Sequence, residues 1–477
     1  MTNKNYKNFS LYTIGNLLPK VFSFILLPIY TTYLNPSNYG IVNSMDVFSG
    51  FLVVFFTLSI ERSIYRLYYD YNNEEDKRTY LGTIVISFFV ISTIILLVLF
   101  VFQNSLSLIF KSIPFYPYYL FAIITSYFSI YSIIPRIYYQ IKEKADYFLF
   151  VSIIQMLANV VFILWFVVYK NEGAIGMLKG ALYGTIFTLP LFIYITTRII
   201  NFKFKFSILR DSLVFSIPMF PVIISSWILN FSDRIFIEHY FSTWEVGIYS
   251  LGFKLASLVL IVVSALDNTF NPIFYRVANE ENQLESILKL KKLVNSYFYI
   301  TIAICFLLAF FSKEIIEILF NERYLKAYSI VPLLCLSYLI SLSGGIFNMM
   351  IYQDKKTKLV MIATIFGAII SILMNFILIP KIGIYGAALS AIISYIITFL
   401  IKYIYAKKCY YIPIDWKYVL PSFVIATALV SVFIFLDIKS LYLGILIKLF
   451  VLSLFILYFY IKYNKIVFKE IRDVQLK

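Results

Sequence analysis

The sequence has little charge, a single histidine and few cysteines. Charged residues make up 14% of its 477 residues, against about 25% in ordinary soluble domains. His239 and the three cysteines, Cys305, Cys335 and Cys409, show no CxxC or Cys/His spacing, so we expect no metal site, no disulfide framework and no cofactor. Long polar stretches are also missing, because none exceeds about 25 residues. A separate soluble domain is therefore excluded.

Apolar residues dominate the chain instead, at 61% of the total. A membrane-spanning helix needs roughly 20 consecutive apolar residues, and 14 stretches meet that requirement. They lie near 9–34, 41–60, 81–103, 117–137, 147–169, 174–197, 211–237, 246–270, 293–312, 327–351, 359–380, 383–404, 418–437 and 440–461. We expect an all-α polytopic membrane protein with 14 transmembrane helices.

Basic residues give a net charge of +16, but they gather in short loops between the apolar stretches. Examples are Lys289, Lys291 and Lys292, and the loop 355–358. Basic loops face the cytoplasm in membrane proteins, which places both termini there and argues against nucleic acid as a partner. The first 20 residues lack the cleavage pattern of a signal peptide, so we expect a retained first helix.

Several short segments recur about 210 residues apart. The segment "YGIVNSMDVF" (39–48) resembles "VGIYSLGFKL" (246–255), and "YQIKEK" (139–144) resembles "YQDKKT" (352–357). Small residues also recur, as Gly176, Gly180 and Gly184 in one half and as Gly386, Ser390 and Ser394 in the other. Six spans per copy give both copies the same orientation. We expect two parallel six-helix bundles around a central cavity, residues 1–205 and 206–410, followed by two additional helices and a cytoplasmic tail, 411–477.

A lysine, Lys254, interrupts the apolar run 246–268. A charge near the bilayer centre costs roughly 2.5 to 3.5 kcal/mol on insertion scales and usually faces water or a partner. Its helix carries a polar stripe, because Ser250, Lys254, Ser257, Ser264 and Asn268 fall on one face. We expect Lys254 to face the central cavity. The alternative is a lysine that extends to the membrane surface or neutralises a structural partner.

Other spans carry similar stripes. Asn16 and Lys20 lie in the first span, Asp46 in the second and Asp233 in the seventh. A rise of 1.5 Å per residue places Asp233 at a depth similar to that of Lys254, so these two side chains could pair. Spans 10 and 11 add polar residues to the predicted central cavity, among them Ser341, Asn348 and Thr364. Lys179 and Lys448 lie close enough to the outer surface to extend to it.

Prolines mark expected bends. Pro19 and Pro28, together with Gly15, are where the first helix can bend, and Pro218 and Pro221 are the corresponding positions of the seventh.

This layout, with a first helix ending "LLPIYTTYLNPSNYGIV", resembles the bacterial oligosaccharide flippases (O-antigen or capsule repeat-unit, Wzx-type) over the whole chain. These belong to the multidrug/oligosaccharidyl-lipid/polysaccharide (MOP) exporter superfamily. The resemblance implies a transporter, not an enzyme, that moves polyprenyl-diphosphate-linked oligosaccharide from the cytoplasmic to the outer leaflet by alternating access, coupled to protons or sodium. It implies the bacterial cytoplasmic membrane, and as partners the lipid-linked substrate, membrane lipids, and polysaccharide polymerase and chain-length regulator proteins.

The resemblance also assigns roles to residues. Lys20, Lys254, Arg234, Asn16 and Ser257 would bind the substrate, while Asp46 and Asp233 would respond to the coupling ion. One feature departs from the related lipid II flippases, which have several arginines in the first helices' cavity, whereas the first span here has only Lys20.

Three other functions fit parts of the pattern. A cation-coupled multidrug exporter of the same superfamily would generally have 12 spans and an acidic cavity. A membrane polysaccharide polymerase or glycosyltransferase would have a long outward loop or a DxD-like acidic site, and the outward loops here are short. A structural scaffold would have no use for charges inside the membrane.

Overall fold

The computed structural model describes residues 3–435, 442–455 and 457, and all regular structure within them is helical. Eleven helical segments are long and apolar enough to cross a membrane. The prediction of an all-α polytopic membrane protein is confirmed.

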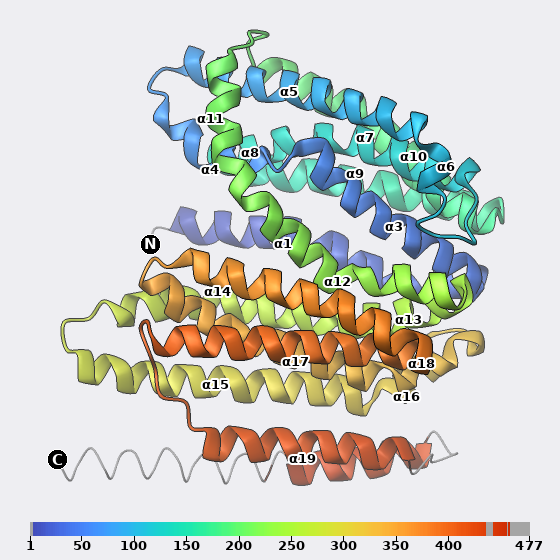
Figure 1. The fold of residues 1–477 in the computed structure, drawn as a ribbon, viewed down its shortest axis with the longest axis vertical. Coiled ribbons are helices and arrows are strands. Elements are labelled where there is room, and N and C mark those ends of the chain that lie inside the picture. The colour runs from blue at the N-terminus through green and yellow to red at the C-terminus, as the bar shows by residue number, and fades with distance from the viewer. Residues whose placement is uncertain (1–2, 436–441, 456, 458–477) are drawn as a thin grey trace.

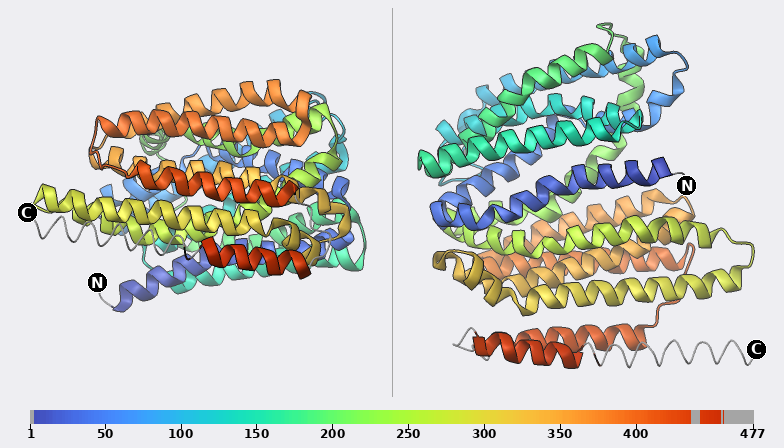
Figure 2. Two further views of the ribbon diagram at one scale, coloured as in Figure 1. Left: turned by 90° about the horizontal axis from the view of Figure 1, so that it is seen from below. Right: turned by 180° about the vertical axis from the view of Figure 1, so that it is seen from behind.

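Figure 1 shows two stacked groups of helices. The upper group contains α3 to α10 and the lower group α12 to α18, and the blue α1 lies between them in both the front and the rear view (Figures 1 and 2). The first ten helices are α1 Asn3–Ile25, α2 Leu27–Tyr33, α3 Pro36–Thr57, α4 Glu61–Leu67, α5 Glu74–Val101, α6 Gln103–Leu106, α7 Leu120–Ser129, α8 Ile133–Ile141, α9 Ala145–Leu164 and α10 Gly173–Ile199. The others are α11 Phe206–Ser216, α12 Phe220–Tyr240, α13 Thr243–Ala256, α14 Leu258–Ala278, α15 Gln283–Phe310, α16 Ser312–Leu319, α17 Val331–Gln353, α18 Thr357–Lys407 and α19 Trp416–Phe435.

The longest helix, α18, contains two of the predicted spans. Its helical dihedral angles break at Ile382 and Gly383, and Gly383 has a φ of +59°, a value that glycine adopts without steric cost. The two arms match the predicted spans 359–380 and 383–404. Shorter apolar helices at 419–433 and 442–455 cover parts of the last two predicted spans, while residues 436–441 and most of the chain after 455 lie outside the described residues.

Each half begins its second membrane helix with the same local signal. Asn35 caps α3 by accepting a hydrogen bond from the backbone N–H of Asn38 (2.8 Å), and Ser242 caps α13 by accepting one from Glu245 (3.5 Å). Capping satisfies a backbone donor that the helix cannot satisfy itself. The two caps lie 207 residues apart, the spacing of the sequence repeat around Gly40 and Gly247.

The first helix breaks where one of the predicted prolines lies. Pro19 remains inside α1, whereas Pro28 lies in the first turn of α2, after a break at Leu26. Backbone N–H groups in the first turn of a helix have no partner within the helix, so a proline there costs no hydrogen bond. Gly15 has a different role from the predicted bend, because a Cβ there would lie 2.8 Å from a ring carbon of Phe148 on α9. Its lack of a side chain lets α1 approach α9.

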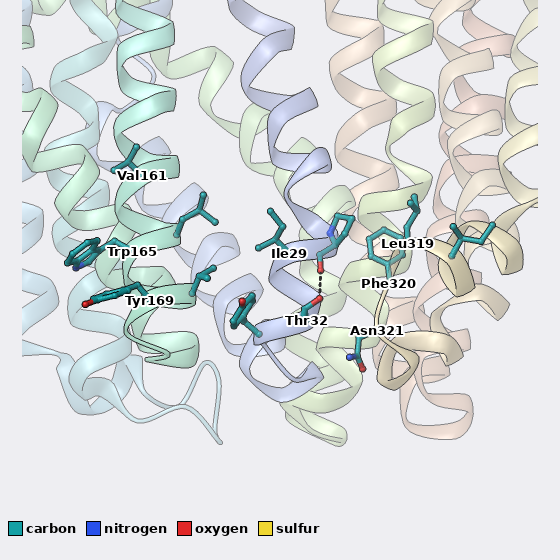
Figure 3. A pocket seen from close by; sticks show the side chains of 13 residues that line it. Ile29, Thr32, Val161, Trp165, Tyr169, Leu319, Phe320 and Asn321 are labelled. Atoms are coloured by element: carbon teal, nitrogen blue, oxygen red, sulfur yellow. Dashed lines mark hydrogen bonds between the residues drawn. The ribbon is translucent and has the colours of Figure 1, made fainter.

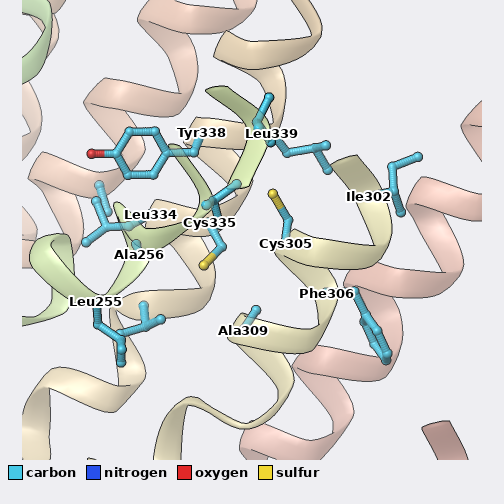
Figure 4. Packing of buried hydrophobic residues seen from close by; sticks show 14 of the residues in the cluster. Leu255, Ala256, Ile302, Cys305, Phe306, Ala309, Leu334, Cys335, Tyr338 and Leu339 are labelled. Atoms are coloured by element: carbon cyan, nitrogen blue, oxygen red, sulfur yellow. The ribbon is translucent and has the colours of Figure 1, made fainter. Parts of the chain in front are cut away.

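Two hydrophobic cores correspond to the two groups of helices. One joins α3, α5, α7 and α10 around residues such as Phe48, Phe88 and Tyr119. The other fills the lower group, where Cys305 and Cys335 are free thiols packed among Ile302, Phe306, Leu339 and Leu255 (Figure 4). The C-terminal end of the first span, with Leu27 and Tyr30 of α2, packs into this second core.

A buried ion pair attaches the helix at 442–455 to the second core. Lys448 donates hydrogen bonds to the Glu314 carboxylate (2.8 Å) and to the Phe310 carbonyl (2.6 Å). Only 7% of the Lys448 side chain and 9% of the Glu314 side chain are exposed. The sequence allowed Lys448 to extend to the membrane surface, but its side chain stays in the interior, where the Glu314 carboxylate neutralises it.

Replacing Glu314 by glutamine is expected to lower the stability by about 2 kcal/mol, because it weakens a charge-assisted hydrogen bond to a buried lysine. The readout is the apparent melting temperature of the purified chain. Glu317→Gln is the matched control, since Glu317 lies 3.9 Å from Lys313 in a more exposed pair, and its effect is expected to stay below about 1 kcal/mol. Equal effects of the two variants would contradict the assignment.

Candidate functional site

Two predicted substrate residues lie on an accessible face of α1. Asn16 and Lys20 are four residues apart, so they share one side of the helix, and both side chains are exposed. They lie at membrane depth within the candidate span 10–33, on α1, the helix that lies between the two groups (Figure 2).

Asp46 from the upper group and Lys254 from the lower group lie close to each other. Asp46 on α3 is exposed and Lys254 on α13 is half-buried, and the two are close enough to interact electrostatically. Arg234 and Lys20 are the cationic neighbours of Lys254. We call Lys20, Asp46 and Lys254 the seam cluster. Ser257 lies next to it, at the junction of α13 and α14, where its hydroxyl donates to the Lys254 carbonyl (2.7 Å).

Asp233 pairs with Arg234, not with Lys254. Its carboxylate accepts hydrogen bonds from the Arg234 guanidinium (2.6 Å), from the Arg234 backbone N–H (2.9 Å) and from the Tyr249 hydroxyl (2.5 Å). The side chains of Arg234 and Asp233 are only 4% and 9% exposed. The sequence-based suggestion of an Asp233–Lys254 pair is thus wrong for this conformation, because the adjacent arginine satisfies the carboxylate.

Arg234 is also held by aromatic rings. Its guanidinium lies 3.8 Å from the ring centre of Phe253, and it donates to the Asn230 carbonyl (2.6 Å). Cation–π contacts of this kind stabilise a desolvated guanidinium. In this conformation Arg234 faces the interior of the lower group, so the predicted position near an exit is not seen.

Two glycines let the halves cross in contact at the predicted outer end. A Cβ on Gly40 would lie 1.8 Å from the Thr243 carbonyl oxygen, and a Cβ on Gly247 would lie 1.9 Å from the Pro36 carbonyl oxygen. Pro36 and Gly40 correspond to Thr243 and Gly247 at the repeat spacing of 207 residues. Each contact is therefore the repeat-related counterpart of the other. Such a self-complementary contact is the kind that a two-fold axis generates. We call it the glycine crossing.

Further contacts close the same end. The Tyr324 hydroxyl, in the 3₁₀ segment Glu322–Ser329, donates to the Leu34 carbonyl (2.9 Å). The buried Glu238 at the end of α12 accepts hydrogen bonds from the backbone N–H groups of Lys111 (3.0 Å) and Ser112 (2.6 Å) and from the Ser112 hydroxyl (2.5 Å). The Glu238 contact joins the upper group to the lower one, and the Tyr324 contact holds the chain between α2 and α3 against the lower group. Together with the glycine crossing they close the predicted outer end.

Aromatic side chains also join the two halves. The Trp227 ring of α12 lies 4.9 Å from Phe51 of α3, and its indole N–H donates to the Val47 carbonyl (3.3 Å). Phe55 meets Phe220 edge-on at 5.3 Å. These rings fix α12 against α3, the helix that carries Asp46.

An apolar groove opens between the halves beside α2. Its volume is about 910 Å³, and it is lined by Pro28 and Ile29 from α2, by Val161 and Trp165 from the α9 segment, and by the chain after α16 at Phe320 (Figure 3). The ring centres of Trp165 and Tyr169 lie 4.6 Å apart with the rings tilted by 30°, and the two residues are 50% and 70% exposed. Exposed Trp and Tyr are typical of the membrane interface.

The polar residues of spans 10 and 11 lie elsewhere. Ser341, Asn348 and Thr364 line a cavity formed by α12, α14, α17 and α18, all elements of the lower group. None of the three seam-cluster residues lines this cavity. The sequence showed which faces of these helices are polar. Which other helices those faces contact depends on packing, which the sequence pattern does not show.

A family model for polysaccharide biosynthesis proteins matches residues 31–332, which is well over half of the chain. The chain belongs to this family. Among curated relatives, a protein of the Lsg locus of Haemophilus influenzae is 26% identical over 58% of this chain and 68% of its own length. The capsular polysaccharide biosynthesis protein CapF of Staphylococcus aureus is 21% identical over 85% of this chain and 100% of its own length.

Solved structures show the same fold. The lipid II flippase MurJ in an inward closed conformation aligns with a TM-score of 0.70 and 17% identity, covering 95% of this family member and 99% of MurJ. A multidrug resistance MATE transporter of the MOP superfamily in an inward-facing conformation aligns at 0.55 with 14% identity, covering 83% and 95%. Membership of the polysaccharide biosynthesis family is therefore confirmed, and the fold is the one seen in the MurJ and MATE structures.

Proposed function

We propose that this polysaccharide biosynthesis protein is a flippase that moves polyprenyl-diphosphate-linked oligosaccharide from the cytoplasmic to the outer leaflet of the bacterial cytoplasmic membrane, with both termini cytoplasmic. The observation that carries the proposal is the seam cluster. Two ammonium groups and one carboxylate are accessible at membrane depth, on elements of both halves. Charges are kept there only at a cost, and a transported anion explains that cost.

The cations suit a diphosphate. Lys20 and Lys254 would form charge-assisted hydrogen bonds to phosphate oxygens, which are stronger than neutral ones, in surroundings less polar than water. Asn16 and Ser257 would contact the sugar units. The same cations disfavour a cationic drug as cargo, so the multidrug alternative loses support.

Asp46 offers a means of coupling. While Asp46 is ionised, it neutralises Lys254 and competes with a phosphate for that lysine. Binding of a proton or a sodium ion to Asp46 would free Lys254 for the cargo. Asp233, which the sequence suggested for the same role, already has three protein donors, so we assign the coupling to Asp46.

The groove beside α2 would hold hydrocarbon. It is apolar, it lies between the halves, and α2 connects directly to the α1 helix that carries Lys20. A polyprenyl chain in this groove would keep its lipid surroundings while the diphosphate lies at the seam cluster. With the outer end closed, loading would take place from the cytoplasmic side, and alternating access would follow by rocking of the halves.

The test is complementation of a bacterial strain that cannot flip its own surface-polysaccharide precursor. The parent chain is expected to restore surface polymer. Lys20→Ala and Lys254→Ala are each expected to lower the polymer yield roughly tenfold or more, because a hydrogen bond to a charged group contributes about 1.5 to 3 kcal/mol and 1.4 kcal/mol is tenfold.

Lys358→Ala serves as the matched control, since Lys358 is an exposed lysine at the start of α18. Membrane abundance of every variant is measured by immunoblot. Full restoration by both Lys20→Ala and Lys254→Ala, at equal abundance, would contradict the assignment of the seam cluster. Polymerase and chain-length regulator proteins are supplied by the host strain, since we propose them as partners.

A further inference from the structure

The polar cavity that Ser341, Asn348 and Thr364 line lies inside the lower group of helices, apart from the seam cluster. Its volume is about 310 Å³, and α12, α14, α17 and α18 line it. Its polar lining includes Ser226, Asn230, Ser341, Asn348, Thr364 and Lys402. The volume lies at the lower end of the range for small-molecule sites and exceeds the share of a single water about tenfold.

Lys402 gives this cavity a positive charge without a matching acid. It lies on the second arm of α18 and is partly buried, and none of the lining residues is acidic. Within the part of the chain that the structure describes, Lys402 makes no hydrogen bond or ion pair. Burying an ammonium group in this way is unfavourable unless something compensates the charge.

Other cations of the chain show the usual compensation. Lys448 pairs with Glu314 at 2.8 Å, and Lys179 pairs with Glu172 at 3.1 Å. Arg234 pairs with Asp233 at 2.6 Å. Lys402 differs from all three because no carboxylate among the described residues compensates its charge.

Two further residues that line the cavity carry buried polar groups without a hydrogen-bond partner among the described residues. Tyr338 is 2% exposed, yet its hydroxyl has no hydrogen-bond partner among the described residues. Figure 4 shows the ring against the core, with its hydroxyl directed away from the thiols of Cys305 and Cys335. The amide of Asn348 has an unsatisfied oxygen, and its nitrogen can take that position by rotation of the amide. Buried polar groups are normally satisfied.

We propose that this cavity, which we call the Lys402 cavity, binds an anion of about phosphate size. The Lys402 ammonium would supply the charge, and rotation of the Tyr338 and Asn348 side chains would bring their hydroxyl and amide groups to the oxygens of the anion. The anion is either free inorganic phosphate or the phosphate group of a lipid, since both present the same oxygens. The site lies outside the seam cluster, so its existence does not depend on the proposed cargo.

The experiment uses the purified full-length chain in phosphatidylcholine nanodiscs. In one arm, inorganic phosphate is titrated at constant ionic strength against HEPES, and the apparent melting temperature is recorded. In the other arm, polyprenyl phosphate is added to the nanodiscs without inorganic phosphate. A ligand that binds only the folded state raises the melting temperature in a saturable way. A response in the first arm identifies a free anion, and a response in the second arm alone identifies the lipid group.

Variants then locate the site. Lys402→Gln and Lys402→Met are expected to weaken the apparent affinity at least tenfold, whereas Lys402→Arg keeps it. Lys358→Gln, an exposed lysine on the same helix, is expected to behave like the parent chain. A parent chain that responds in neither arm would overturn the proposal, as would a response that both charge-removing variants retain. Because binding is measured on purified protein, failure here is distinct from failure of the complementation test.

Discussion

Gly40→Ala and Gly247→Ala are expected to destabilise the protein, although alanine is the better helix former at both sites. In an exposed helix the change from glycine to alanine is favourable by up to about 1 kcal/mol. At the glycine crossing the new Cβ would lie 1.8 Å or 1.9 Å from a carbonyl oxygen of the other half. Backbone atoms cannot give way as a side chain can, so we expect a loss of about 1 to 3 kcal/mol or more, as in overpacked cores, together with loss of polymer export.

Each helix of the crossing provides its own control. On α3, a Cβ at Gly50 would meet its nearest atom at 3.7 Å, and on α13 a Cβ at Gly252 would do so at 3.4 Å. Gly50→Ala and Gly252→Ala are therefore expected to be neutral or stabilising in the same melting assay. The Gly40/Gly247 double variant is expected to lose less than the sum of the single losses, because one separation of the helices relieves both clashes. Stabilisation by Gly40→Ala would show that the halves do not meet in this way.

Asp233→Asn is expected to cost about 3 to 5 kcal/mol, the usual range when one member of a buried ion pair is removed. The variant leaves the buried Arg234 with its aromatic contacts but without a carboxylate. Replacing both residues, as in Asp233→Asn with Arg234→Met, removes the unpaired charge and is expected to recover most of the loss. The readout is again the apparent melting temperature, with abundance in the membrane as a second measure.

An exposed pair supplies the comparison. Arg66 and Asp70 also form an ion pair, but their side chains are 62% and 49% exposed, so Asp70→Asn is expected to cost about 0 to 1 kcal/mol. If Asp233→Asn cost no more than Asp70→Asn, the pair would not lie in a desolvated interior.

The membrane spans could be predicted from the sequence because hydropathy depends on length and composition alone. Their ends were harder to place. The predicted second span begins at 41, whereas α3 begins at Pro36, because the Asn35 cap and Pro36 start the helix inside a segment that looks like a loop. The long α5 begins at Glu74, seven residues before the predicted 81, since charged residues of its first turn extend beyond the apolar stretch.

The candidate site was predictable only in part. Lys20, Asp46 and Lys254 stood out as charges within apolar runs, and the structure places all three in one region. The partner of Asp233 could not be predicted from the apolar runs. It pairs with Arg234, its neighbour in sequence, and with Tyr249, which only helix packing brings near. Lys402 was missed because it lies close to the predicted end of its span at 404, where a solvated lysine is ordinary.

The connection between the halves limits how they can move. The chain after residue 205 first forms α11, whose residues Ile208 and Leu213 pack with the core of the upper group, and α12 then enters the lower group. Only residues 217–219 separate these two helices, as a 3₁₀ turn that precedes Pro221. At about 3.5 Å per residue, so short a tether allows the flanking helix ends to part by roughly 10 Å before a helix unwinds. Any wider gap between the two groups of helices near this turn must therefore open by rotation about the turn.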